Sequence, residues 1–220
     1  SIQKIDEADA ILIVGSNPRW EASVLNARIR KAYLHNDCKI GLIGKSFDLT
    51  YKYSHLSECL SFLNEIIEGK SFFCEILKKA KKPIIIIGNS AINGEDGEDV
   101  LDLCAQISKQ FISAESSWNG FNILQQDISK VGALDIKFYN REFSTNFNNS
   151  VKMHLDTYKP VVFLLGSDEL DHSILNNAFV IYIGHHGDNS AQIADIVLPS
   201  PAYTEKFSTY VNMEGRVLQS

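Results

Sequence analysis

The chain has 220 residues, of which 45% are hydrophobic and 22% charged, so it can build a substantial core in one large domain or two small ones. The formal net charge of −6 argues against a broad surface for nucleic acid or anionic lipid. No apolar run approaches the ~20 residues of a membrane-spanning helix, and no signal peptide is visible. Because the chain starts without methionine and stops without a clear closing element, we expect a piece of a longer protein.

Six short apolar runs, rich in Ile and Val, each stop at glycine or proline. They do not alternate with polar residues, which is typical of strands covered on both faces. Helical patterns lie between them: one follows the first run, two fill residues 57–80 with a break near Gly69, and one spans residues 98–110. This alternation predicts an α/β fold with mostly parallel, doubly wound sheets and helices on both faces. The predicted strands are Ile11–Val14, Ile40–Ile43, Ile84–Ile87, Val161–Leu165, Val180–Ile183 and Ile196–Leu198.

A polar, Asn-rich stretch over residues 140–150 interrupts this alternation. After it, a second unit opens, and its apolar run leads into Gly166-Ser167-Asp168 much as the first run leads into Gly15-Ser16-Asn17-Pro18. The two stretches resemble two versions of one strand-to-turn element. We therefore predict a first α/β lobe over residues 1–139, a linker over 140–155 and a second, incomplete lobe over 156–220.

Glycine turns follow three of the predicted strands, among them those at Gly15 and Gly166. Ligands of open parallel sheets bind beyond the carboxyl ends of the strands, and a helix N-terminus there favours an anion. Asn17 is a good N-cap, Pro18 suits the first helical position, and Glu21 lies in the first turn, where the helix dipole favours it. Strand-to-helix turns also select such residues for conformational reasons alone. No turn matches a dinucleotide fingerprint or a P-loop, so the pattern does not support NAD, FAD or ATP binding in the common manner.

Two features raise the question of a metal site. In the stretch GHHGD, residues 184–188, His185 and His186 are adjacent, and neighbours in an extended chain point to opposite faces, so a polar turn is favoured over a metal site. No C-x-x-C pair is present, which predicts reduced, buried thiols in an intracellular protein rather than zinc or iron–sulphur ligands. The four cysteines are Cys38, Cys59, Cys74 and Cys104.

Four blocks of the sequence carry a family resemblance. IADIVLPSPAYTEKFSTYVNMEGRV, residues 193–217, resembles the molybdopterin oxidoreductase signature in which ADVVLP leads to EK-x-GT-x-x-N-x-EGR. ADAILIVGSNPRWEASVLNARIRKA, residues 8–32, resembles the superfamily's strand, G-x-N-P turn and helix. Residues 118–136 and 182–188 are similar, within that superfamily, to the large iron–sulphur subunits of NADH-quinone oxidoreductase (respiratory complex I). The four blocks agree in order over nearly the whole chain.

The resemblance implies two Rossmann-like lobes of the formate dehydrogenase/DMSO reductase type. It implies a non-catalytic structural domain that supports electron transfer from NADH to quinone by 2Fe-2S and 4Fe-4S clusters outside this chain, with no cofactor in the chain itself. Other subunits of the peripheral arm would be its partners, at the cytoplasmic or matrix face of the inner membrane, without nucleic acid or direct membrane insertion. The alternatives are the cofactor-binding domain of an active molybdopterin oxidoreductase and, more weakly, an unrelated small-nucleotide-binding protein.

In catalytic members of the superfamily, the G-x-N-P turn and its second-lobe counterpart hold nucleotide ends of the paired pterins. Here Arg19 and Trp20 follow the proline, where a bound nucleotide would want small or polar neighbours and room. Phe207-Ser208-Thr209 lacks the signature's glycine, and Asp168 and Glu169 would repel a phosphate. We therefore expect a vestigial site. By resemblance it comprises Gly15, Ser16, Asn17, Pro18, Gly166, Ser167, Asp168, His185, His186 and Glu205.

Overall fold

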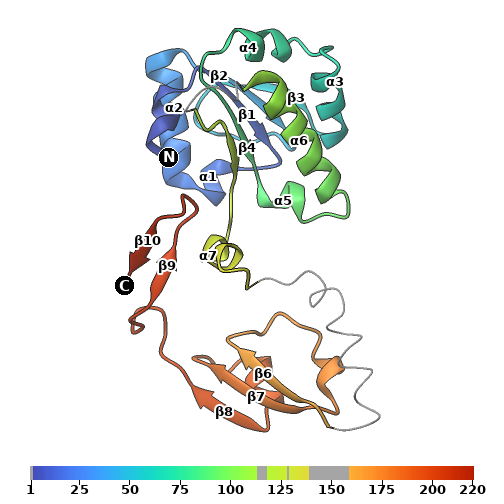
Figure 1. Cartoon of the computed structure of the whole chain (residues 1–220), viewed down its shortest axis with the longest axis vertical. Helices are drawn as coiled ribbons and strands as arrows, with labels where there is room; N and C mark the ends of the chain where they lie inside the picture. Colours follow the sequence, from blue (N-terminus) through green and yellow to red (C-terminus); the bar gives the residue numbers. More distant parts are fainter. Residues whose placement is uncertain (1, 113–117, 128, 139–158) are drawn as a thin grey trace. The chain divides into compact units, whose positions relative to one another are not determined.

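The computed structural model describes residues 2–112, 118–127, 129–138 and 159–220 (Figure 1). They form two compact units: Ser1–Lys130 with Met213–Gly215, and Val131–Asn212 with Arg216–Ser220. The linker predicted over 140–155 lies outside the described residues, so the predicted lobe boundaries stay a prediction. Among the described helices, none has the length and apolar character needed to cross a membrane.

The first unit is built on a five-stranded parallel sheet with the order β3-β2-β1-β4-β5. Every residue of β1 and β4 is buried, which explains why these runs show no polar alternation. The strand order reverses between β1 and β4, and ligands of doubly wound sheets bind at such a switch point. The strands are β1 (Ala10–Val14), β2 (Lys39–Ile43), β3 (Ser54–Ser57), β4 (Pro83–Ile87) and β5 (Phe121–Ile123).

Helices cover both faces of this sheet, as predicted (Figure 1). Leu12 of β1 packs in one core cluster with α3 (Leu63–Ile67), α4 (Phe73–Lys79) and α6 (Gly97–Phe111). Its neighbour Ile11 packs in a second cluster with η1 (Ile2–Glu7) and α2 (Ser23–Asn36), because side chains alternate across a strand. The predicted break at Gly69 is confirmed, and so is the helix predicted over 98–110. Short segments complete the unit: η2 (Leu60–Phe62) and α5 (Asn89–Ile92).

The helix predicted after the first strand is in fact two helices. Residue Ala22, at φ −151° and ψ 67°, separates α1 (Pro18–Glu21) from α2. The apolar period that predicted one long helix belongs to α2 alone, where Leu25 and Ile29 are buried. The residues before α2 form the short helix α1, which continues directly from the turn at the end of β1.

The second unit holds a three-stranded parallel sheet with the order β6-β7-β8, which confirms the three later predicted strands. An antiparallel hairpin, β9 with β10, follows it. The elements are α7 (Lys130–Asp135), whose first residue belongs to the first unit, then β6 (Val161–Leu165), η3 (His172–Leu175), β7 (Phe179–Gly184), α9 (Asn189–Ile193), β8 (Ile196–Pro199), β9 (Thr209–Val211) and β10 (Val217–Gln219).

In the second sheet, the described residues cover only one face. In β6, Val162 and Leu164 are buried, whereas Val161, Phe163 and Leu165 are 56%, 60% and 68% exposed. Both faces of β6 are apolar, so the sequence run resembles that of a fully buried strand. An apolar sequence shows that both faces of β6 are suited to burial. In the described part of the chain, only the face with Val162 and Leu164 is buried.

Candidate functional site

The turn after β1 packs backbone against backbone with the turn after β4. Gly15, at φ +56°, donates its N–H to the carbonyl of Ile43 at 2.8 Å, and Gly88 donates its N–H to the carbonyl of Val14 at 2.8 Å. A Cβ on Gly15 would lie 2.5 Å from the Cβ of Ala91, and one on Gly88 would lie 2.1 Å from the carbonyl oxygen of Gly15. The space between these strand ends is therefore filled by the two turns and by α5.

A carboxylate from α1 occupies the hydrogen-bond donors of the first turn. The hydroxyl of Ser16 donates to Oε2 of Glu21 at 2.9 Å, and the N–H of Asn17 donates to Oε1 of the same carboxylate at 2.7 Å. Ser16 is buried, and Pro18, which follows Asn17, has no N–H to offer. Hydrogen bonds to a charged acceptor are stronger than neutral ones. These two donors are thus committed within the chain.

Asn17 stands at the N-cap position and Pro18 at the first helical position, as predicted. The side chain of Asn17, however, makes no capping hydrogen bond, and its Oδ1 is buried without a partner. Two more amide oxygens in the described region, Oδ1 of Asn89 and Oε1 of Gln125, are also buried without partners just after β4 and β5. This edge of the sheet therefore keeps unused acceptors, while Ser16 and the N–H of Asn17 already have partners.

The turn after β6 repeats the geometry of the first turn. Gly166 has φ +60° and donates its N–H to the carbonyl of Ile183, on the neighbouring strand, at 2.8 Å. This supports the interpretation of the two turns as versions of one element. The packing around Gly166 differs from that around Gly15, because a Cβ on Gly166 would meet no heavy atom within 4 Å.

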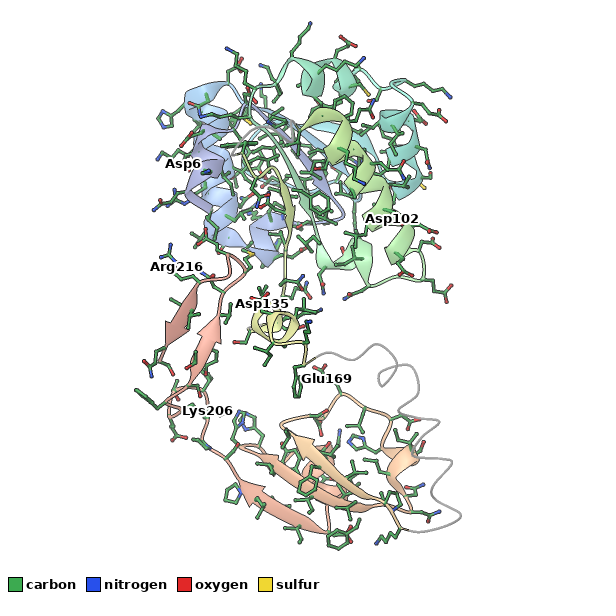
Figure 2. All side chains as sticks on the ribbon, in the orientation of Figure 1. Asp6, Asp102, Asp135, Glu169, Lys206 and Arg216 are labelled. Atoms are coloured by element: carbon green, nitrogen blue, oxygen red, sulfur yellow. The ribbon has the colours of Figure 1, made fainter. Side chains whose placement is uncertain are left out.

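A carboxylate also ties this second turn to the start of α9. The N–H of Ser190 donates to Oδ1 of Asp168 at 2.6 Å, and the Ser190 hydroxyl donates to the carbonyl of Ser167 at 2.7 Å. Nε2 of His172 lies 2.9 Å from the same hydroxyl oxygen. The hydrogen bond from the Ser190 N–H is the main cause that lowers the pKa of Asp168. Asp168 is therefore an ionised acceptor inside a local network (Figure 2 shows the side chains of this unit).

The remaining predicted residues lie on the surface of the second unit. His185 and His186 are exposed, and their ring centroids are 4.4 Å apart, so the expected opposite orientation is wrong. They sit in a bend after β7, where the alternation of an extended strand no longer applies. Glu205 is exposed and accepts a hydrogen bond from the N–H of Ala202 at 3.0 Å. In the described ranges, no three His, Cys, Asp or Glu side chains gather closely enough to hold a metal ion.

The cysteines follow the prediction with one exception. Cys38, Cys74 and Cys104 are buried free thiols, and burial raises the pKa of Cys38 and Cys104 to about 12. Cys59 is exposed, contrary to the prediction. Its Sγ lies 2.9 Å from Oγ of Ser61, and this hydrogen bond lowers the pKa of Cys59.

Of the ten predicted residues, Gly15 to Pro18 belong to the first unit and the other six to the second. Two residues whose hydrogen bonds hold these turns, Glu21 and Ser190, were not part of the predicted site. Glu21 was expected only as a favourable charge in the first helical turn, and Ser190 was not singled out. The sequence signal for Ser190 is the Asp188-Asn189-Ser190 stretch, which is typical of a helix start.

Comparison with known proteins decides the family. The molybdopterin oxidoreductase family matches residues 1–220. The chain belongs to the molybdopterin oxidoreductase family. It is 42% identical over 98% of its length to the NADH-ubiquinone oxidoreductase 75 kDa subunit of Reclinomonas americana. It is 43% identical over 99% to the mitochondrial 78 kDa subunit of Neurospora crassa, and 40% identical over 98% to an NADH-quinone oxidoreductase subunit of Rickettsia bellii. It spans only 31%, 28% and 30% of these relatives' own lengths.

Proposed function

We propose that the chain is a non-catalytic structural domain of the large iron–sulphur subunit of NADH-quinone oxidoreductase. The names of three relatives at 40–43% identity support this assignment. Since the chain spans less than a third of each of them, the 2Fe-2S and 4Fe-4S clusters that carry electrons from NADH toward quinone would be bound by the rest of the polypeptide. Other peripheral-arm subunits would be its partners, at the matrix or cytoplasmic face of the inner membrane.

The observation that carries the non-catalytic part of this proposal is the closure of the GSNP turn by Glu21. A phosphate bound there would need the Ser16 hydroxyl and the Asn17 N–H, and both already donate to the Glu21 carboxylate. The same carboxylate would repel the phosphate at short range. The contact of Gly15 with Gly88 and Ala91 leaves no room for a ligand between these two glycines. The residues present thus do not fit a phosphate-bearing cofactor at this turn.

The second turn supports the same proposal independently. Asp168 brings a negative charge to the place where the resemblance would put a nucleotide contact, and its carboxylate already accepts the N–H of Ser190. Within each unit, a carboxylate of the chain takes up donors that an anionic ligand would require. We infer that both turns are relics of cofactor binding, kept as structural joints.

The metal content of the full-length protein, purified from its native source, tests this proposal. Molybdenum and tungsten are counted against iron. We expect iron with neither of the other two metals. Near-stoichiometric molybdenum or tungsten would overturn the proposal and favour the alternative, in which the same turns belong to the cofactor-binding domain of an active molybdopterin oxidoreductase.

A further inference from the structure

Two asparagines of the chain are followed directly by glycine, in Asn93-Gly94 and Asn119-Gly120. Such a pair can lose ammonia without an enzyme, because the backbone nitrogen of the glycine attacks the side-chain amide carbon of the asparagine and closes a succinimide ring. Glycine favours the attack, since it has no Cβ to obstruct it. The two pairs share this chemistry, so the structure around each pair decides which of them reacts.

Asn93 and Gly94 lie exposed in the loop between α5 and α6 (Figure 1). Among the described residues, the N–H of Gly94 and the side-chain amide of Asn93 have no hydrogen-bond partner. A Cβ on Gly94 would meet no heavy atom within 4 Å, so nothing packs against this peptide group. Ring closure requires the backbone of Asn93 to rotate from its ψ of −6°. The N–H of Asn93, which donates to the carbonyl of Asn89 at 3.0 Å, precedes the bond that rotates, so α5 can stay intact during the reaction.

Asn119 and Gly120 lie just before β5 and are held in place by their neighbours. Oδ1 of Asn119 accepts the N–H of Phe121 at 3.3 Å, and the carbonyl of Gly120 accepts the N–H of Ile85 at 2.6 Å. A Cβ on Gly120 would lie 2.3 Å from the carbonyl oxygen of Pro83, so this peptide group is packed against β4. Its rotation would break the pairing of β5 with β4, and ring closure there must wait for local opening of the sheet edge.

We propose that Asn93 is a site of spontaneous deamidation in the native protein and that the fold protects Asn119 from the same reaction. The nitrogen of Gly94 forms a bond to Cγ of Asn93, the side-chain nitrogen leaves as ammonia, and no oxidant or reductant takes part. Water then opens the ring at either carbonyl carbon. The products are an ordinary aspartate and an isoaspartate, whose main chain runs through Cγ. The reaction needs only the chain and water, so it is independent of the function proposed above.

The modification changes a segment that borders the first glycine turn. Both products add a negative charge just before residues 95–99, which already carry four carboxylates. The isoaspartate also lengthens the main chain between α5 and α6 by one carbon. The helix α5 packs on Gly15 through Ala91, and the hydroxyl of Ser90 donates to the carbonyl of Gly15. The change therefore accumulates with the age of each molecule at the end of the helix that supports this turn.

Incubation of the full-length protein in buffer made with water enriched in heavy oxygen tests the proposal. The new carboxyl group takes an oxygen from this water when the ring opens, so peptide mass spectrometry separates reaction in the native protein from reaction during digestion. We expect Asn93 to be converted at least about tenfold faster than Asn119, because Asn119 reacts only after local opening. Equal rates at the two asparagines, or no conversion at Asn93, would overturn the proposal.

Two controls test whether the structure and the ring closure cause the difference. In urea, where the fold is lost, the two asparagines should be converted at similar rates, and a ratio unchanged from the native protein would contradict protection by the fold. Gly94→Ala places a Cβ in open space at a residue without positive φ, so the variant should fold normally. It should slow the conversion of Asn93 about tenfold, since the Cβ obstructs the attack, and leave Asn119 unaffected. Conversion of Asn93 at the original rate in this variant would overturn the proposal.

Discussion

Glu21 is the residue on which our proposal of a vestigial first turn mainly rests. It follows Asn17 by four positions, so α1, which is a single helical turn, brings its carboxylate back over the turn that precedes it. Both oxygens are used, one for a hydroxyl and one for a backbone N–H. Because Ser16 is buried, its hydroxyl cannot form a hydrogen bond with water if the Glu21 carboxylate is removed.

Glu21→Ala should destabilise the first unit by about 2 kcal/mol, because it leaves the buried Ser16 hydroxyl and the Asn17 N–H without an acceptor. Glu21→Gln, which keeps one acceptor oxygen, should cost about half as much. Urea unfolding followed by tryptophan fluorescence measures the effect, since both tryptophans of the chain lie in this unit. Glu95→Ala, in an exposed loop of the same unit, is the control and should have little effect.

Asp168 predicts a pH dependence in the second unit. Its pKa is lowered by the Ser190 N–H, so the stabilisation is complete above the unfolded-state pKa of about 3.9 and is lost as the pH falls through the lower pKa of the folded state. The protection factor of the Ser190 amide, from hydrogen exchange, should therefore be higher at pH 6 than at pH 2. In Asp168→Asn that difference should vanish, whereas Glu169→Gln should retain it.

At the scale of elements, the two strand-to-turn joints share a backbone and differ in packing. Gly15 and Gly166 have nearly the same positive φ, and each N–H reaches the carbonyl at the end of the neighbouring strand. The sequence predicted this likeness, because strand ends and glycine turns are local features. It did not predict that the first joint is wedged against α5, because that contact joins segments about 75 residues apart. Nor did it predict the break at Ala22, which separates α1 from α2.

The shared φ makes the two glycines a matched pair. Gly166→Ala should cost about 1 kcal/mol, the strain of a left-handed backbone with an added Cβ in open space. Gly15→Ala adds the overlap with Ala91 to the same strain and should cost about 3 kcal/mol or more. Hydrogen-exchange protection of the β1 and β6 amides measures the loss of stability caused by each substitution. Equal losses would mean that the packing of the first turn is looser than described.

At the scale of the whole molecule, the strands and the α/β class were predictable because buried parallel strands leave uninterrupted apolar runs. The short strands β3 and β5 were not, since SHLS and FNI carry no such run. The apolar run of β6 does not by itself show how much of it is buried, since among the described residues only Val162 and Leu164 are. Likewise, the turns of the candidate site were found, while the contacts of Glu21 and Ser190 that close them were not.

Thiol accessibility tests the packing on both faces of the five-stranded sheet, because Cys74 and Cys104 lie in one core cluster and Cys38 in the other. In the native 220-residue chain, a thiol reagent at pH 8 should modify Cys59 rapidly and the other three cysteines only on unfolding, since burial holds the pKa of Cys38 and Cys104 near 12. Cys59→Ser should abolish the rapid phase. Rapid reaction of two or more thiols would contradict the packing of the helices on this sheet.

The closure of the first turn by Glu21 has a consequence for how such a protein is made. A turn whose donors await a bound anion reaches full stability only when that ligand is present, because the ligand's binding free energy adds to folding. Here a side chain four residues away fills that place from the moment the chain folds. If the first turn is a relic of cofactor binding, as we propose, the first unit matures at a rate set by its own synthesis, with no step that waits for a supply of cofactor.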